Sequence, residues 1–239
     1  MRTFRILFFF AALLLPAMAL NAQIPGFAKK LINQGTPGFT EKEAGDAIRE
    51  ALQKGITSTV ALVSKTDGYF GNPEIKIPFP QEARDIESRL RSVGLGNLAD
   101  EVILTMNRAA EDAAKEALPI FTSAITGMTL SDAIGIVQGT DNAATQYLSR
   151  TTTPQLKEAF LPVIRKSLAR VNATKAWEAA VTAYNKIPFV KKENSDLPDY
   201  VTGKSIDGMF TMIAKEELKI RKDPAGRTTD LLRKVFGNR

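Results

Sequence analysis

Apolar residues recur every three or four positions along most of this chain, which is the spacing of one face of an α-helix. The spacing first holds over residues 40–65, behind a Thr40–Glu43 pair that can form a reciprocal capping box at a helix start. Only residues 74–79 alternate between polar and apolar positions as a strand does. Pro78 and Pro80 indicate an extended segment rather than part of a large sheet. The other helical patterns cover residues 24–33, 83–93, 98–118, 156–171, 177–184, 206–220 and 228–236.

The central stretch, residues 128–153, is predicted to form a helix, a tight turn and a second helix. Thr129 can cap the first of these, with Asp132 three residues later as a shorter substitute for the glutamate of a capping box. Gly139 is expected to end that helix in the left-handed conformation. Thr140 or Asp141 should then cap the second helix.

Prolines and glycines predict breaks in several helices. Thr153–Pro154 is expected to end one helix and begin another, because proline is favoured in the first turn. Pro119 should kink or restart the alanine-rich helix of residues 98–118. A break at Gly55 is possible, because glycine in a helix costs about 1 kcal/mol. Residues 189–199 are charged and contain a proline, so they are predicted to form a loop.

The fold class that follows is all-α. We expect a single-domain helical bundle of about nine helices with one short extended segment near residues 74–79, because the chain has no alternation of strands and helices. Residues 23–239 should form this one α-helical domain, whose 217 residues are enough for a sizeable core.

Residues 1–22 have the pattern of a secretory signal peptide. Two arginines precede an apolar run over residues 6–15, and small residues lead to a cleavage position after Ala22, or alternatively after Ala19. The run is shorter than the roughly 20 residues that span a bilayer, although an uncleaved anchor is the alternative. The protein is therefore expected to be exported, to the periplasm or beyond. A lipid-modified cysteine is excluded, since the chain has no cysteine.

The absence of histidine and cysteine excludes several kinds of catalytic and metal site. Without them there is no Ser-His-Asp or Cys-His nucleophile, no ordinary zinc, haem or iron–sulfur ligation and no disulfide. We expect no cofactor and no metal. An enzyme would have to use carboxylates, lysine, tyrosine, serine or a hard metal ion.

The positive charge is concentrated at the C-terminus. Removal of residues 1–22 leaves 30 basic and 26 acidic residues, and residues 215–239 hold eight of the basic and four of the acidic ones. The body is thus neutral in sum and the tail is basic. Such a tail can contact an anionic membrane surface, although a solvated helix face explains it as well. A nucleic-acid partner is not expected.

Three apparent motifs are weak. Residues 94–99 match a dinucleotide fingerprint but follow an amphipathic helix instead of a buried strand, which favours a helix–helix turn. Residues 203–205 resemble the end of a P-loop, but Pro198 stands where its first glycine belongs. Asp67 and Asn72 lie in a glycine-containing loop and could offer oxygen ligands to calcium, but too few carboxylates accompany them, so a turn is favoured.

Two polar clusters remain. Asn107, Arg108 and Glu111 lie within one turn of an alanine-rich helix. A second set surrounds the end of the helix over residues 206–220 and consists of Glu216, Glu217, Arg221, Asp223 and Arg227. Paired carboxylates can act as acid and base in glycoside hydrolysis. Surface salt bridges, worth under about 1 kcal/mol, are the favoured interpretation.

Four stretches resemble a family of secreted bacterial proteins, the domain of unknown function 4197. They are residues 67–80, 106–113, 128–153 and 196–237. Many members look like lipoproteins, which this chain cannot be without a cysteine. The resemblance implies an exported, helical, single-domain protein and no particular activity. It also implies recurring polar positions, which correspond here to Asp67, Asn72, Asn107, Arg108, Glu111, Asp132, Asp141, Arg150, Arg221 and Arg227.

These observations favour a protein that binds a molecule rather than transforms it. The first hypothesis is an amphiphilic or lipid-like ligand held between helices, the second a cell-envelope module that recognises protein or glycan, and the third a carboxylate-dependent hydrolase. The candidate ligand-binding residues are Asn107, Arg108, Glu111, Asp132, Asp141, Arg150, Arg221 and Arg227. The oligomeric state is left open.

Overall fold

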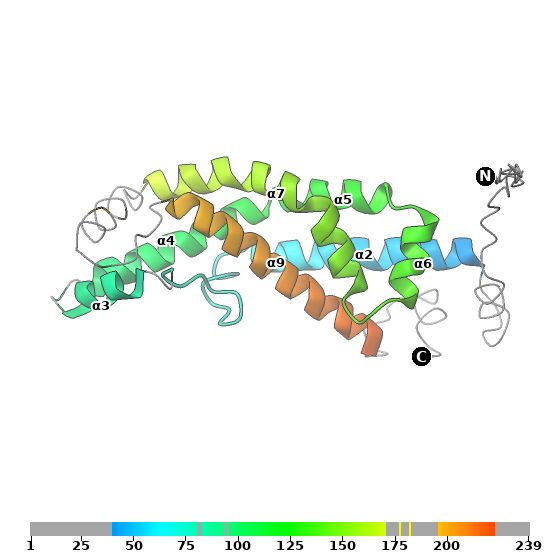
Figure 1. The fold of residues 1–239 in the computed structure, drawn as a ribbon, viewed down its shortest axis with the longest axis horizontal. Coiled ribbons are helices and arrows are strands. Elements are labelled where there is room, and N and C mark those ends of the chain that lie inside the picture. Colours follow the sequence, from blue (N-terminus) through cyan, green and yellow to red (C-terminus); the bar gives the residue numbers. More distant parts are fainter. Residues whose placement is uncertain are drawn as a thin grey trace, which may run out of the picture. The chain divides into compact units, whose positions relative to one another are not determined.

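The computed structural model describes residues 40–80, 83–92, 94, 96–170, 177, 182 and 196–222, all within one compact unit, Gly38–Arg239. These residues contain seven α-helices and no β-strand, which confirms an all-α helical bundle (Figure 1). The predicted signal peptide and the helices predicted over residues 24–33 and 228–236 lie outside the described residues. No single described helix is long and apolar enough to cross a membrane, although α5 and α6 pass that test together with a 102° bend between them.

Helix α2 (Glu41–Val63) begins with the predicted capping box. The Thr40 hydroxyl accepts from the Glu43 amide at 3.2 Å, and the Thr40 amide donates to the Glu43 carboxylate at 2.6 Å. The possible break at Gly55 does not occur, since α2 runs through it. A Cβ at Gly55 would meet the Glu216 side chain at 3.4 Å, so the glycine allows α9 to lie close to α2.

The next helices begin and end where glycine and proline predicted. Helix α3 (Arg84–Ser92) is followed by Gly94, whose φ of 81° is left-handed, and then by α4 (Gly96–Ala114). The resemblance to a dinucleotide fingerprint is therefore a turn between two helices. Pro119 lies in the first turn of α5 (Ala117–Thr126), which confirms the predicted restart.

Helix α6 (Leu130–Gln138) confirms the capping box between Thr129 and Asp132, with both reciprocal hydrogen bonds at 3.1 Å. The prediction of a left-handed Gly139 is wrong, because its φ of −77° and ψ of −173° are extended. Glycine is required there for space instead. A Cβ would lie 2.6 Å from that of Ala143 and 2.8 Å from the Gly135 carbonyl oxygen.

The predicted break at Thr153–Pro154 is also wrong. One helix, α7, spans Ala143–Arg170 with Pro154 and Pro162 inside it, and Figure 1 shows it changing direction along its length. Proline removes a helix hydrogen bond and bends the helix. The hydroxyls of Thr152 and Thr153 each donate at 2.6 Å to the carbonyl oxygen four residues earlier, a contact that often bends a helix. The buried stripe beyond the bend consists of Leu156, Phe160, Ile164 and Leu168.

The last described helix, α9 (Leu197–Lys222), starts well before the predicted residue 206. Pro198 occupies its first turn, where the missing amide is tolerated, so the end of the predicted loop at residues 189–199 and the P-loop-like residues 203–205 are helical. Helix α9 contacts α7, α2 and α4, and Figure 1 shows it crossing α2 obliquely.

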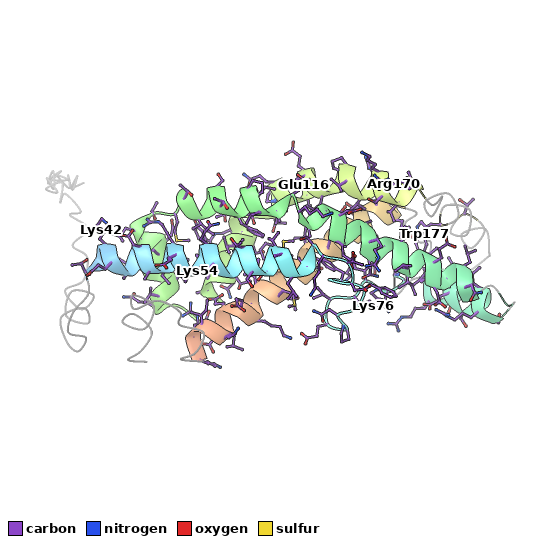
Figure 2. All side chains as sticks on the ribbon, turned by 180° about the vertical axis from the view of Figure 1, so that it is seen from behind. Lys42, Lys54, Lys76, Glu116, Arg170 and Trp177 are labelled. Carbon is purple, nitrogen blue, oxygen red and sulfur yellow. The ribbon has the colours of Figure 1, made fainter. Side chains whose placement is uncertain are left out.

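Residues 64–80 connect α2 to α3 without regular structure. The predicted alternation over residues 74–79 is present, since Ile75, Ile77 and Phe79 are at most 5% exposed while Glu74 and Lys76 are exposed. These residues do not form a strand. The Phe79 ring lies 6.0 Å from that of Trp177, which is also buried and is labelled in Figure 2.

Candidate functional site

The first polar cluster attaches the connecting segment, residues 64–80, to α4. Glu111 is 3% exposed, and one of its carboxylate oxygens accepts from the amides of Tyr69 and Phe70, each at 3.1 Å. Its other oxygen accepts from the Arg108 guanidinium at 2.7 Å. The carboxylate therefore replaces the backbone acceptors that a regular element would give these two amides.

Arg108 extends this cluster to the surface. Its guanidinium also donates to Asp67 at 2.7 Å, and hydrogen bonds to Glu111 and Asp67 raise the pKa of Arg108. Asp67 has a left-handed φ of 62° at the start of the turn, a conformation that aspartate tolerates better than most residues. The sequence set Asp67, Arg108 and Glu111 thus meets in space and holds a turn.

Asn107 anchors the extended part of the same segment. Its side-chain oxygen accepts from the Ile77 amide and its side-chain nitrogen donates to the Ile77 carbonyl, both at 2.8 Å. Asn107 is fully buried, so it satisfies both backbone groups of a residue that has no strand partner.

Tyr69 joins the segment to α9. Its hydroxyl donates to the Ser205 carbonyl oxygen at 2.5 Å, and burial, followed by the charges of Glu111 and Asp207, raises the pKa of Tyr69 well above its usual value. Asn72 makes a local turn by accepting from the Glu74 amide at 3.1 Å, which confirms its turn-forming role. No group of three carboxylates in the described part of the chain is arranged to hold a metal ion.

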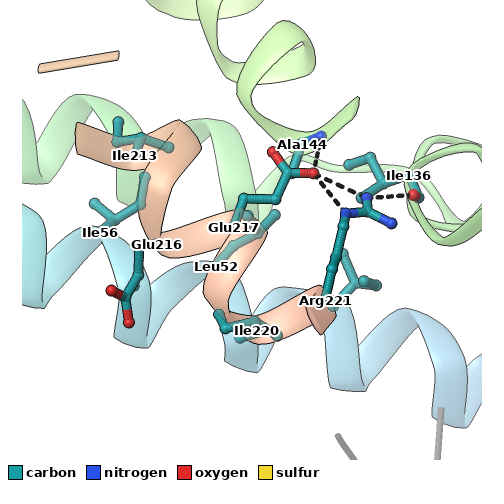
Figure 3. A pocket seen from close by; sticks show the side chains of 12 residues that line it. Leu52, Ile56, Ile136, Ala144, Ile213, Glu216, Glu217, Ile220 and Arg221 are labelled. Atoms are coloured by element: carbon teal, nitrogen blue, oxygen red, sulfur yellow. Dashed lines mark hydrogen bonds and ion pairs between the residues drawn. The ribbon is translucent and has the colours of Figure 1, made fainter. Parts of the chain in front are cut away.

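The second cluster is at the start of α7 and is shown in Figure 3. Glu217 of α9 accepts from the amides of Ala144 and Thr145 at 2.9 Å and from the Thr145 hydroxyl at 2.8 Å. The first amides of a helix have no partner within it. A carboxylate about 70 residues away in the chain therefore caps α7.

Arg221 completes this second cluster. Its guanidinium donates to Glu217 at 2.8 and 3.0 Å and to the Ile136 carbonyl at 2.8 Å. The ion pair is structural, as its helical spacing indicated, but it is not on the surface, since the two side chains are only 6% and 7% exposed. Figure 3 shows the neighbouring Glu216 carboxylate pointing away from that of Glu217, so these two do not form an acid–base pair.

An apolar pocket lies beside the second cluster, between α2, α6, α7 and α9 (Figure 3). Its volume is about 40 Å³. A cavity of about 150 Å³ is needed to hold a molecule as small as benzene. This pocket is therefore too small for the apolar part of an amphiphile. It is lined chiefly by Ile48, Leu52, Ile56, Ile136, Ile213 and Ile220.

The other predicted site residues lie elsewhere. Asp132 caps α6, and its hydrogen bonds with Thr129, together with the charge of Arg150, lower its pKa. Asp141 pairs with Lys222 at 2.9 Å. Arg150 is exposed and lies 5.8 Å from the centre of the Tyr147 ring. Arg227 lies outside the described residues.

The two clusters are separate. Tyr69 contacts α9 at Ser205, whereas the second cluster is built on Glu217, twelve residues later. At about 1.5 Å per residue this is about 18 Å along α9. Of the candidate residues, Asn107, Arg108 and Glu111 belong to the first cluster and Arg221 to the second, and each cluster organises backbone groups.

A larger hollow lies between residues 74–79 and α9. This groove has a volume of about 240 Å³, enough for a small organic molecule. Ile75, Ile77 and Phe79 contribute its apolar wall, and Tyr200 donates from α9 to the Pro78 carbonyl at 3.1 Å. The two polar anchors, Asn107 and Glu111, hold the segment that forms this wall, so they position the groove without lining it.

Helix α9 supplies the opposite wall. Four lining residues recur at spacings of four, three and four and so share one side of the helix: Tyr200, Lys204, Asp207 and Thr211. Gly208 lies on the same side, where a Cβ would be 2.8 Å from the Tyr69 ring and 3.1 Å from the Ile75 Cβ. Glycine at this position lets the segment approach α9.

Among the described residues that line the groove, basic side chains outnumber acidic ones. Lys76, Arg84 and Lys204 line it from three different elements, all are exposed, and none forms an ion pair with a described carboxylate. Lys76 lies 4.1 Å from the centre of the Phe70 ring. Of the two acidic residues in the lining, Glu74 pairs with Lys215, which leaves Asp207. An anionic group is the complementary ligand.

Sequence reasoning missed the groove and the role of Glu217. Glu217 follows Ile213 by four residues and precedes Ile220 by three, so a carboxylate at a core position of the apolar stripe was the signal. The cations of the groove come from residues 76, 84 and 204, and the last of these was assigned to a region before the predicted helix start. The sequence pattern therefore did not predict that Lys204 lies on the same side of a helix as Tyr200 and Asp207.

The sequence comparisons place the chain in a family. A family model described as a protein of unknown function (DUF4197) matches residues 38–237, which include every described residue. No curated protein and no solved structure matches the chain. This chain therefore belongs to the DUF4197 family.

Proposed function

We propose that this protein is an exported helical binding protein that takes a small anionic amphiphile in the groove between residues 74–79 and α9. The observation that carries the proposal is the combination of room and chemistry in one place. A volume of about 240 Å³ is bounded by an apolar wall and by Lys76, Arg84 and Lys204. Ligand sites commonly pair an apolar lining with a few placed polar groups.

The polar network behind the groove supports a binding role. The segment over residues 74–79 has no strand partner, yet Asn107 and Tyr200 hold the backbone groups of Ile77 and Pro78. A wall fixed in this way loses little conformational freedom when a ligand binds, which favours affinity. Asn107, Arg108 and Glu111 thus act on the ligand through the segment that they hold.

Export is part of the proposal and rests on the pattern of residues 1–22. N-terminal sequencing of protein from a cell-envelope fraction should find Gln23 as the first residue. Finding Met1 there would contradict cleavage.

Binding can be tested by isothermal titration with octyl phosphate as the anionic probe and octyl glucoside as its neutral counterpart. We expect octyl phosphate to bind and octyl glucoside not to bind. Lys204→Gln and Arg84→Gln should each raise its Kd about tenfold, since a charged hydrogen bond contributes about 1.5 kcal/mol. Lys54→Gln, on α2 and outside the groove, is the matched control and should leave the Kd unchanged.

Equal binding of the two probes, or an unchanged Kd in Lys204→Gln, would contradict the anionic groove. Native mass spectrometry of protein taken from its own envelope then identifies what occupies it. A co-purified macromolecule in place of a small molecule would favour the envelope-module hypothesis.

A further inference from the structure

Helix α7 carries many more basic than acidic residues, although the body of the protein is neutral in sum. It carries five basic residues and one acidic residue, Glu158. Helix α4, which packs against it, carries one basic and four acidic residues. The basic residues of α7 are Arg150, Lys157, Arg165, Lys166 and Arg170.

All five cations are exposed, and they are spread along about 30 Å of helix at about 1.5 Å per residue. Beyond the bend of α7, Lys157, Arg165, Lys166 and Arg170 form no ion pair with any carboxylate in the described part of the chain. The buried stripe of α7 takes the opposite side. The charge is thus directed outward and is not neutralised within the fold.

We infer that the solvent side of α7 binds an anionic lipid surface. Four or more clustered Lys and Arg residues on a helix are attracted to anionic head groups. Exposed Pro154 and Pro162 and half-buried Leu161 lie among the cations, and the long Lys and Arg stems can lie along a bilayer surface beside them. A single-stranded nucleic acid would need exposed aromatic rings for stacking, whereas Tyr147 and Phe160 of α7 are buried.

The sequence alone suggested the C-terminal tail as the membrane contact, so the two locations must be separated. Vesicles of phosphatidylglycerol with phosphatidylcholine, and of phosphatidylcholine alone, are sedimented with the full protein. Three double variants are compared: Arg165→Glu with Lys166→Glu on α7, Arg233→Glu with Lys234→Glu in the tail, and Lys42→Glu with Lys54→Glu on α2. Each changes the net charge equally, and Figure 2 labels Lys42 and Lys54 on α2 and Arg170 on α7.

We expect the protein to sediment only with the anionic vesicles. The α7 variant should lower the partition coefficient at least about tenfold, given the attraction of each basic residue to such a surface. The α2 and tail variants should lower it less than about twofold. Binding should also disappear as ionic strength rises from about 0.01 M to about 1 M, because the Debye length shortens from about 30 Å to about 3 Å.

Equal losses in all three variants would overturn the assignment to α7, because binding would then follow net charge. A loss confined to the tail variant would move the contact to residues 223–239 and overturn it as well. Displacement of the protein from vesicles by an equal charge concentration of duplex DNA would make α7 a nucleic-acid surface instead. Circular dichroism of each variant confirms that the helices are intact.

Discussion

Glu111 and Glu217 both accept hydrogen bonds from backbone amides that lack a backbone partner, in two regions of the molecule. Each is a buried glutamate that accepts from two consecutive backbone amides and from an arginine of its own helix. At Glu111 the amides belong to an irregular segment, and Arg108 is 36% exposed. At Glu217 they belong to the first turn of α7, and Arg221 is 6% exposed.

The difference between them lies in what depends on each carboxylate. Loss of Glu111 would detach the connecting segment, residues 64–80, part of which forms one wall of the groove. Arg108 would lose one partner, but its side chain is already partly exposed, so water can solvate its charge. Loss of Glu217 would leave a buried guanidinium without its counter-charge and a helix start without its cap. A buried charge without a partner is far more costly than an exposed one. We therefore expect Glu217 to govern stability and Glu111 to govern the groove.

The largest effect should come from Glu217→Ala. Removing one partner of a buried ion pair costs about 3–5 kcal/mol, so we expect about 4 kcal/mol of the free energy of unfolding to be lost. Chemical denaturation measures this change. Glu216→Ala, at the neighbouring position whose carboxylate points away, is the control and should cost less than about 1 kcal/mol. Equal costs would mean that the cap of α7 is not important.

Glu111→Ala should cost about 3 kcal/mol, because it leaves the Tyr69 and Phe70 amides without an acceptor, and each unsatisfied buried group costs about 1–3 kcal/mol. Hydrogen exchange should speed up at these two amides. Octyl phosphate should also bind more weakly to Glu111→Gln, whereas Glu217→Gln should leave its Kd unchanged. Weaker binding to Glu217→Gln and unchanged binding to Glu111→Gln would contradict the assignment of Glu111 to the groove and of Glu217 to stability.

Because Tyr69 is buried, alkaline pH should lower the free energy of unfolding. Burial raises the pKa of Tyr69 above its usual value of about 10, so the folded state disfavours the ionised form. Stability is therefore complete below pH 10 and falls as the pH rises above it, since only the unfolded state releases the proton. At pH 11 the loss relative to neutral pH should be about 1.4 kcal/mol. Denaturation curves of Tyr69→Phe should show a shallower decrease, and equal slopes would contradict a buried phenol.

The parts of the fold that were predicted correctly are those in which the interacting atoms are close in sequence. The capping boxes at Thr40 and Thr129 are complete within four residues, and Pro119 acts on its own turn. Pro154 does not end the helix, because the buried stripe of α7 packs on both sides of it and outweighs the lost hydrogen bond. Tertiary packing thus overrides a local preference.

The polar residues were located by sequence but their partners were not. Arg108 and Glu111 share a helical side as expected, yet their function depends on amides about 40 residues away. The groove joins residues 76, 84 and 204, which no local pattern relates. Buried polar residues at core positions of a helical stripe predict an internal partner, and only the fold identifies which one.

The smallest expected effect concerns Asp141. Capping of α7 by Asp141 would make Asp141→Ala cost about 1 kcal/mol. The structure instead places its carboxylate 2.9 Å from Lys222, with side chains 59% and 64% exposed, while Glu217 accepts from the Ala144 and Thr145 amides. Exposed pairs contribute about 0.2–1 kcal/mol, so Asp141→Ala should cost less than about 0.5 kcal/mol, and that small cost should disappear in 1 M salt. Asp132→Ala is the comparison, because Asp132 completes a capping box and should cost about 1 kcal/mol. If the two substitutions cost the same at high salt, Asp141 caps the helix after all, and Glu217 shares that role.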